Sequence, residues 1–250
     1  MIRNNSSRFN IKGVIFDFDD TLVDTEEWYY LADSATLKSF GVDLSREEKQ
    51  LYTGISPHDF WQAFAERYKI GESIDSLIER TQSNYLSIAK KRIKLMPHMN
   101  GILEWFSENG YRMAIASGSS KRVLEELLKV LGISSIFSAI VSSEEVAKGK
   151  PAPDVFLEAS KRLSIPPSEL VVFEDSQFGV ISAKAAGMCC IAIPSRANGA
   201  LPQPFYSADL LFDKGRGEFS IERVAAELGL HCKKPLFKSG SSNELSLQIP

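Results

Sequence analysis

Two aspartates separated by one residue, Asp17 and Asp19, follow a short apolar run near the start of the chain. Apart from Lys12, residues 11–16 lack polar alternation, which is typical of a strand buried on both faces of a sheet. Just past the end of such a strand, two carboxylates can converge on one point if the chain turns there. Because two nearby anions repel each other, this spacing predicts a bound cation, and oxygen ligands favour a hard one such as Mg²⁺.

An aspartate-rich turn also has a simpler interpretation. Asp and Thr side chains hydrogen-bond their own backbone, so Asp17, Asp19 and Thr21 can form a turn that holds no ion. For this stretch alone the two interpretations are equally good. Other parts of the sequence have to decide between the metal site and the simple turn.

The composition limits the class of protein. A length of 250 residues with 44% hydrophobic content suits one large domain, or a core with a modest insert.

A net charge of −3 without blocks of like charge offers no basic surface, so we expect no nucleic-acid partner. No apolar run approaches the ~20 residues of a membrane span, so we expect no membrane association. Three cysteines, two of them adjacent, suit neither a disulfide framework nor a zinc site. Together with residues 1–10, which lack the apolar segment of a signal peptide, they indicate the cytoplasm.

Residues 25–95 predict helices and no strand. Apolar side chains recur at helical spacing, and the first three expected helices follow cap residues at Thr25 or Asp24, at Ser45 and at Ser56. A fourth helix is expected at residues 74–89. Its apolar stripe includes Tyr85, and we interpret that stripe as the core of a helical bundle, together with the side chains of Trp28 and Trp61.

From residue 96 onward, strands alternate with helices. Strands are expected at residues 111–116, 139–141, 170–173 and 189–193. This alternation predicts an α/β fold with a Rossmann-like, mostly parallel sheet, in which ligands bind beyond the carboxyl ends of the strands. The same rule gathers, at one edge of the sheet, the polar residues that follow three strands: Asp17, Asp19, Ser117, Glu174 and Asp175.

Each of these positions also has a purely structural interpretation. The loop at residues 117–120 and the acidic pair Glu174–Asp175 can cap the helices that follow them. Lys150, in a proline-rich loop at residues 148–154, would by default be a solvated lysine. These separate interpretations do not explain why the features occur together. The chain carries, in this order, an acidic pair, a hydroxyl-bearing loop, a lysine and a second acidic pair.

In this order, the residues resemble the four motifs of the haloacid dehalogenase-like hydrolases. The subgroup in question has a helical cap inserted after the first motif, and it includes sugar-phosphate phosphatases and β-phosphoglucomutase. The resemblance covers residues 11–230, with the motifs at residues 17–21, 116–119, 149–154 and 173–180. One departure is Asp20, at a position where the family most often has glycine.

The resemblance implies a role for each motif residue. Asp17 is the expected nucleophile, which forms an aspartyl phosphate, and Asp19 is the expected general acid and base. The expected Mg²⁺ is held by Asp17, the backbone carbonyl of Asp19 and Asp175, with Glu174 supporting it directly or through water. Phosphate binding is expected from Ser117, Gly118 and Lys150.

The resemblance also implies a division of the chain. A Rossmann-like catalytic core is expected from residues 9–24 and 96–232, a helical cap that selects the substrate from residues 25–95, and a tail from residues 233–250. The expected protein is a monomer that hydrolyses a small phosphate monoester, a sugar phosphate, with Mg²⁺.

Three other functions are compatible with parts of the sequence. A β-phosphoglucomutase-like isomerase would use the same nucleophile, but this chain has Tyr29 and Pro57 where that enzyme has a histidine and an arginine. A receiver-type signalling domain would have no helical insert and no acid two residues after the phosphorylated aspartate. A non-catalytic binding protein on this fold is disfavoured by the intact acidic set and Lys150. His58, in the expected cap loop at residues 52–58, is interpreted as either a substrate contact or a surface histidine.

Overall fold

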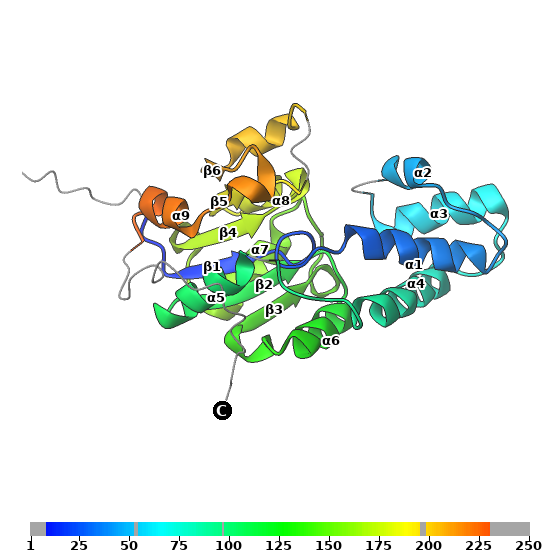
Figure 1. Cartoon of the computed structure of the whole chain (residues 1–250), viewed down its shortest axis with the longest axis horizontal. Coiled ribbons are helices and arrows are strands. Elements are labelled where there is room, and N and C mark those ends of the chain that lie inside the picture. Colours follow the sequence, from blue (N-terminus) through cyan, green and yellow to red (C-terminus); the bar gives the residue numbers. More distant parts are fainter. Residues whose placement is uncertain (1–8, 53–54, 97, 196–198, 231–250) are drawn as a thin grey trace, which may run out of the picture.

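Six parallel strands form a single sheet in the order β3-β2-β1-β4-β5-β6 (Figure 1). The computed structural model describes residues 9–52, 55–96, 98–195 and 199–230, so the expected tail lies outside the described residues. The strands are β1 (Gly13–Phe16), β2 (Arg112–Ser117), β3 (Ala139–Ser142), β4 (Leu170–Glu174), β5 (Cys189–Ala192) and β6 (Leu210–Leu211). The predicted α/β fold with a parallel sheet is therefore confirmed. The two-residue strand β6 was not foreseen from the sequence.

Helices cover both faces of this sheet, and β1 is therefore buried on both sides. Phe16 packs into one hydrophobic cluster, and its neighbour Ile15 packs into the other; both are fully buried. The first cluster includes side chains of α5 (Met99–Glu108), α6 (Lys121–Leu131) and α9 (Ile221–Leu228). The second includes side chains of α7 (Asp154–Leu163) and α8 (Gln177–Ala185). Neither α5 nor α9 was predicted from the sequence.

Five short 3₁₀ helices occur in the described part of the chain. They connect strands and helices of the sheet-bearing region, and their bounds are η1 (Ser134–Ile136), η2 (Ser143–Glu145), η3 (Pro167–Glu169), η4 (Gln203–Ser207) and η5 (Gly215–Glu218).

Between β1 and α5, the described residues form four helices, a helical segment that lies to one side of the sheet (Figure 1). They are α1 (Glu26–Lys38), α2 (Arg46–Gln50), α3 (Pro57–Tyr68) and α4 (Ile74–Ala89). Ser45 and Ser56 accept the expected capping hydrogen bonds, whereas Thr25 makes no side-chain cap bond, so that part of the prediction is wrong.

The helical segment has its own hydrophobic cluster, which includes Leu37, Trp61, Phe64 and Leu77. Trp61 is almost fully buried there, as predicted. Trp28 is only half-buried, so it does not lie fully in the bundle core as predicted; it packs against the first cluster, which also includes Tyr85 and Leu86 of α4. Its position at the start of α1, close to the sheet, explains this difference.

The chain enters and leaves the helical segment through two linkers that lie side by side. Val23 on the outgoing linker forms an antiparallel bridge with Leu95 on the returning one. The backbone N–H of Met96 donates to the carbonyl of Leu22 at 2.9 Å. These contacts bring the two linkers together where they leave the sheet.

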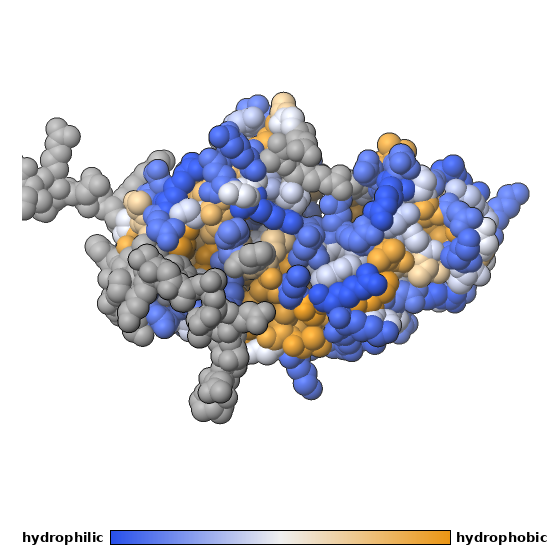
Figure 2. All heavy atoms as spheres, in the orientation of Figure 1, coloured by the Kyte–Doolittle hydropathy of each residue, from blue (hydrophilic) through white to orange (hydrophobic). Residues whose placement is uncertain are grey.

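Hydrophilic residues dominate the visible surface of the helical segment, and hydrophobic surface is confined to smaller patches (Figure 2). Among the described residues, no helix combines the length and the apolar character needed to cross a membrane. The apolar side chains are used chiefly in the internal clusters.

Candidate active site

Asp17 and Glu174 lie next to each other at the carboxyl edge of the sheet. Phe16 of β1 is paired with Phe173 of β4, so the residues that follow them occupy the same level on adjacent strands. Residues paired in this way project to the same side, and neighbouring strands are only about 4.8 Å apart. Both side chains are buried. The strand register therefore places two carboxylates in a space where they repel each other.

Lys150 lies between these two carboxylates. Its Nζ is 2.6 Å from Oδ1 of Asp17 and 2.6 Å from Oε1 of Glu174. It also donates to the backbone carbonyl of Ala116 at 3.1 Å. Burial alone would lower the pKa of Lys150, but the charges of Asp17 and Glu174 outweigh it and raise the pKa. This lysine therefore stays charged inside the site.

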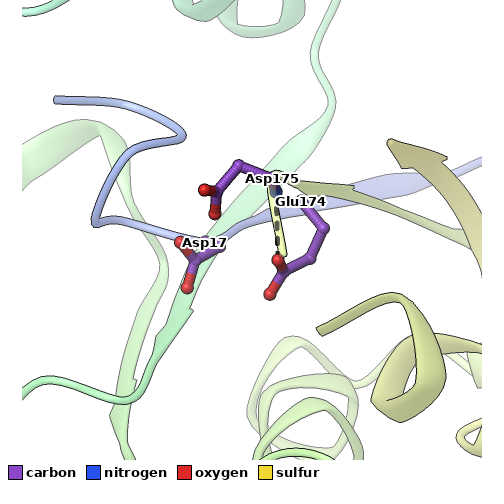
Figure 3. A group of neighbouring side chains, drawn as sticks. All are labelled: Asp17, Glu174 and Asp175. Atoms are coloured by element: carbon purple, nitrogen blue, oxygen red, sulfur yellow. Dashed lines mark hydrogen bonds between the residues drawn. The ribbon is translucent and has the colours of Figure 1, made fainter. Parts of the chain in front are cut away.

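A third carboxylate, that of Asp175, completes an acidic cluster with Asp17 and Glu174 (Figure 3). Each of the three residues offers an oxygen, and these atoms lie within 4.8 Å of one another. Thr21 donates to Oδ1 of Asp175 across a long 3.4 Å contact. One lysine cannot balance three carboxylates that are held so closely.

The electrostatics of this cluster fit a bound divalent cation. Burial raises the pKa of Asp17 to about 8, and the charges of Glu174 and Asp19 add to this effect against the opposing charge of Lys150. Burial and the neighbouring carboxylates raise the pKa of Asp175 well above its usual range. A cation would offset this repulsion, and a set of carboxylate oxygens is the donor set that Mg²⁺ prefers.

Glu174 is fixed by hydrogen bonds on its inner side. Its Oε2 accepts from the backbone N–H groups of Asp175 and Ser176, both at 3.0 Å, and from the hydroxyl of Ser176, also at 3.0 Å. Gly179 allows this arrangement, because a Cβ at that position would lie 1.8 Å from the carboxylate of Glu174. The start of α8 is therefore shaped to hold this side chain in one orientation.

The carboxylate of Asp19 lies in different surroundings, formed mainly by hydroxyl groups. Its Oδ2 accepts from Ser119 at 2.5 Å and from Ser117 at 3.3 Å. Its Oδ1 accepts from the hydroxyl of Tyr85 at 3.4 Å. Burial raises the pKa of Asp19, and these hydroxyl donors oppose that rise. No lysine or arginine in the described part of the chain forms an ion pair with it.

Two tyrosines of the helical segment reach this part of the site. The rings of Tyr29 on α1 and Tyr85 on α4 are stacked, with centroids 4.1 Å apart. The hydroxyl of Tyr29 lies 2.6 Å from that of Ser119. Burial raises the pKa of both tyrosines well above their usual range, so both carry their protons. The helical segment is thus connected to Asp19 by hydrogen bonds.

Ser117 is the last residue of β2, and Gly118 begins the loop that follows it. The hydroxyl of Ser117 donates to Asp19 and accepts from the backbone N–H of Ser119 at 3.0 Å. Gly118 is exposed, and a Cβ there would meet nothing within 4 Å. Its carbonyl accepts from Ser143 at 2.8 Å, which anchors the loop to the end of β3.

All seven residues selected from the sequence are described, and the contacts above connect most of them at this edge of the sheet. The contribution of Tyr85 was not predicted from the sequence: its ring is buried as predicted, but its hydroxyl contacts Asp19. No role was predicted for Ser119 either, although this residue belongs to the second motif. Helical periodicity identifies a buried ring, but it does not indicate where the hydroxyl group points.

Other candidates lie away from these contacts or outside the described residues. His58 is exposed, with 64% of its side chain accessible, and its nearest acidic partner is Asp59 at 3.8 Å. Within the expected cap loop, residues 53–54 lie outside the described residues.

The fold is a parallel sheet with a helical segment after its first strand. Its carboxyl edge combines a buried lysine with an acidic cluster. These features define an α/β enzyme whose site suits an anionic substrate. A family model for haloacid dehalogenase-like hydrolases matches residues 14–193. The chain therefore belongs to this family, which confirms the resemblance.

Several named relatives and solved structures are similar to the chain. Hexitol phosphatase B of Escherichia coli (strain K12) is 31% identical over 189 residues, which cover 74% of this chain and 84% of that protein. Fructose-1-phosphate phosphatase YqaB of the same strain is 30% identical over 181 residues, covering 72% and 95%. The crystal structure of CbbY from Rhodobacter sphaeroides in complex with phosphate has a TM-score of 0.72 at 28% identity, covering 81% and 94%. At the level of enzyme class, the expected phosphoric monoester hydrolase of this family is confirmed.

Proposed function

We propose that the protein is a Mg²⁺-dependent phosphatase that hydrolyses a small phosphate monoester, a sugar phosphate, through an aspartyl phosphate on Asp17. The relatives named as phosphatases of a hexitol and of fructose 1-phosphate support the substrate class. The contacts within the site support the chemistry.

One observation carries the proposal: two carboxylates that are two residues apart have different partners. Asp17 faces Lys150 and the acidic cluster, whereas Asp19 faces hydroxyl groups. Different surroundings around two close carboxyl groups are the usual basis for two different catalytic roles. This arrangement supports Asp17 as the nucleophile and Asp19 as the acid and base.

In the first step, a carboxylate oxygen of Asp17 attacks phosphorus, and the bond between phosphorus and the ester oxygen breaks. Asp19 donates its proton to the departing alkoxide, which leaves as an alcohol. The raised pKa of Asp19 favours the protonated form that this step needs. The products of the step are the free sugar and the aspartyl phosphate.

In the second step, water attacks phosphorus, and Asp19 takes a proton from that water. The bond between phosphorus and Asp17 breaks, which releases inorganic phosphate and regenerates the carboxylate. The hydrogen bonds from Ser119, Ser117 and Tyr85 hold Asp19 beside the transferring group, where it serves both steps.

The remaining motif residues bind charge. Lys150, Ser117 and the backbone N–H of Gly118 are proposed to bind phosphoryl oxygens. The proposed metal ligands are Asp17, Asp175 and the backbone carbonyl of Asp19, with Glu174 in support. When bound, Mg²⁺ offsets negative charge on the phosphoryl group, which allows an anionic nucleophile to approach it.

The helical segment at residues 25–95 is proposed to act as the cap that selects the substrate. Tyr29 and Tyr85 support this assignment, because they project from α1 and α4 to the hydroxyl groups around Asp19. A cap in this position limits the space for the leaving group and excludes bulk water. Tyr29 stands where a mutase has a histidine, so hydrolysis is preferred to isomerisation.

The test is phosphate release from a panel of sugar phosphates, nucleotides and an aryl phosphate, with Mg²⁺ or with a chelator. We expect Mg²⁺-dependent release that is fastest with a sugar phosphate. Asp17→Asn should lower kcat by about 10⁴-fold or more, because it removes the nucleophile. Asp43→Asn is the matched control, since Asp43 is exposed and pairs with Lys38 at the surface.

Three outcomes would count against the proposal. Wild-type protein that releases no phosphate with Mg²⁺ would contradict the activity. Retention of most activity by Asp17→Asn would contradict the nucleophile. Conversion of glucose 1-phosphate to glucose 6-phosphate faster than phosphate release, with the bisphosphate activator present, would favour the mutase.

A further inference from the structure

Asp20 adopts a backbone conformation that is uncommon for a residue with a side chain. Its φ of +57° lies in the left-handed region, which glycine enters without steric cost and which aspartate tolerates better than most residues. It lies directly after Asp19, on the linker that leads to α1. The contacts of its side chain explain why an aspartate is useful here.

The carboxylate of Asp20 caps the first turn of α1. Its Oδ1 accepts from the backbone N–H of Thr25 at 3.1 Å and from that of Glu26 at 3.3 Å. Thr25 occupies the usual cap position but makes no side-chain cap bond. Asp20 therefore satisfies N–H groups that the helix itself leaves without partners. A glycine at this position cannot do so.

Arg216 holds the other side of Asp20. It lies on η5, which follows the last strand of the sheet, and its Nη2 donates to the carbonyl of Asp20 at 2.8 Å. The same nitrogen is 3.4 Å from Oδ1 of Asp20, and Nη1 is 3.8 Å from Oδ2 of Asp24. One guanidinium group thus contacts both ends of the outgoing linker, and its planar shape suits such a double contact.

A cavity lies beside the two linkers on the side of Arg216. This cavity, of about 200 Å³, borders Asp20 and Thr21 on the outgoing linker and Met96 on the returning one, and Arg216 also lines it. Apolar side chains, among them Met99 and Phe219, line the rest of this cavity. The contacts of Arg216 with Asp20 therefore lie at the border of a space that side chains do not fill.

We propose that Asp20 and Arg216 are positioning residues, which hold the start of α1 against the sheet and thereby place Tyr29 and the rest of the helical segment over Asp19. The inference rests on the proposed function, because it takes the helical segment to be the cap. Tyr29 lies on the first turns of α1, and its hydroxyl is 2.6 Å from Ser119. Movement of the helix start would therefore disturb the contacts around Asp19.

Hydrogen exchange measures the position of the helix start without any need for activity. In Asp20→Gly, the amides of residues 21–28 should exchange about 10-fold faster than in wild type, because Thr25 and Glu26 lose a charged acceptor. Glycine relieves the backbone cost at this position, so the fold should be kept. Asp20→Asn retains an oxygen acceptor, so its increase should be smaller.

Two matched controls separate this effect from general destabilisation. Ser164→Gly also introduces glycine at a positive φ of +53°, at the end of α7, far along the chain from α1. Arg162→Met removes an arginine of similar exposure from α7, where its partners include Glu145 and Glu158. Neither control should change exchange at residues 21–28, whereas Arg216→Met should increase it.

Activity supplies the second measurement. For Asp20→Gly and Arg216→Met, kcat/KM for the preferred sugar phosphate should fall about 10-fold, which corresponds to about 1.4 kcal/mol of lost transition-state stabilisation. For a small aryl phosphate it should fall less than about 3-fold, because that substrate has a good leaving group and depends less on Asp19 and the cap.

Wild-type exchange at residues 21–28 in Asp20→Gly would overturn the proposal. Faster exchange with equal losses for both substrates would overturn it too, because the pair would then stabilise the helix without positioning the cap. If wild-type protein has no phosphatase activity, the proposed function fails, and with it the positioning role. The exchange data would then still show whether the two residues hold the helix start.

Discussion

Asp17 and Asp19 are two residues apart, yet one lies in a charged half of the site and the other in a hydroxyl half. The charged half contains Lys150, Glu174 and Asp175, all from the sheet-bearing region. The hydroxyl half contains Ser117 and Ser119 from the sheet-bearing region, and Tyr85 from the helical segment. The charged half can thus form without the helical segment, whereas the hydroxyl half needs both parts of the molecule.

This difference separates two requirements of phosphoryl transfer. Binding an anion and a metal requires fixed charges, and the rigid edge of a sheet supplies them. Proton transfer requires a carboxyl group whose protonation can change, and neutral hydroxyl donors leave that freedom. We expect changes in the charged half to affect metal binding, and changes in the hydroxyl half to affect proton transfer.

After the loss expected from Asp17→Asn, the largest expected effect is that of Asp19→Asn. The amide cannot donate or accept the proton, so kcat for a sugar phosphate should fall about 10²- to 10⁴-fold. The loss should be smaller for an aryl phosphate, whose leaving group needs less protonation. Steady-state kinetics with both substrates checks this. An equal fall in kcat for the two substrates would contradict the assignment of Asp19 as the general acid.

A smaller effect is expected from Gly179→Ala. The new Cβ would lie 1.8 Å from the carboxylate of Glu174, so this side chain has to move. The affinity for Mg²⁺ should fall about 10- to 100-fold, as is typical when a supporting group of a metal site is displaced. Titration of activity with Mg²⁺ measures this change. Gly71→Ala is the control, because a Cβ there meets nothing within 4 Å.

A few-fold effect is expected from Tyr85→Phe and Ser119→Ala. Each removes one hydroxyl that donates directly to Asp19, which should lower kcat about 2- to 10-fold. These donors oppose the rise in the pKa of Asp19, so their loss raises that pKa further. The basic limb of the pH–rate profile should therefore move to higher pH. An unchanged profile would show that these hydroxyl groups only fill space.

The smallest expected effect concerns stability in the charged half. Without a cation, folded Asp17 keeps its proton up to about pH 8, whereas the unfolded carboxyl ionises near its ordinary pKa of 3.8. The metal-free fold therefore loses stability as the pH rises between these values, and a bound cation removes this penalty. Saturating Mg²⁺ should raise Tm by about 5–10 °C at pH 8.

The same Mg²⁺ addition should raise Tm less at pH 5, where protons compete with the metal for the carboxylates. Thermal unfolding with and without Mg²⁺ at both pH values measures this difference. Asp175→Asn should reduce the rise at pH 8. If Mg²⁺ raised Tm equally at both pH values, or raised the Tm of this variant as much as that of wild type, the metal would not bind at this acidic cluster.

The charged half could be predicted from the sequence because it follows from local rules. Apolar runs identify the buried strands, parallel strands end at one edge of the sheet, and residues that follow those strands are brought together. Asp17, Glu174 and Asp175 were found in this way, and the order of the motifs gave the family. The two-domain division, the roles of the seven site residues and the monomeric state remain predictions.

Only the tertiary structure revealed the contacts of Tyr85, Ser119, Asp20 and Arg216. The hydroxyl of Tyr85 meets a residue 66 positions earlier, and Arg216 contacts a residue 196 positions earlier. Periodicity indicates which face of a helix is buried, but the direction of a hydroxyl group and the proximity of a distant arginine depend on how whole elements pack. The sequence by itself thus determined the sheet and its acidic edge. The packing of the helical segment against that edge decided what surrounds Asp19.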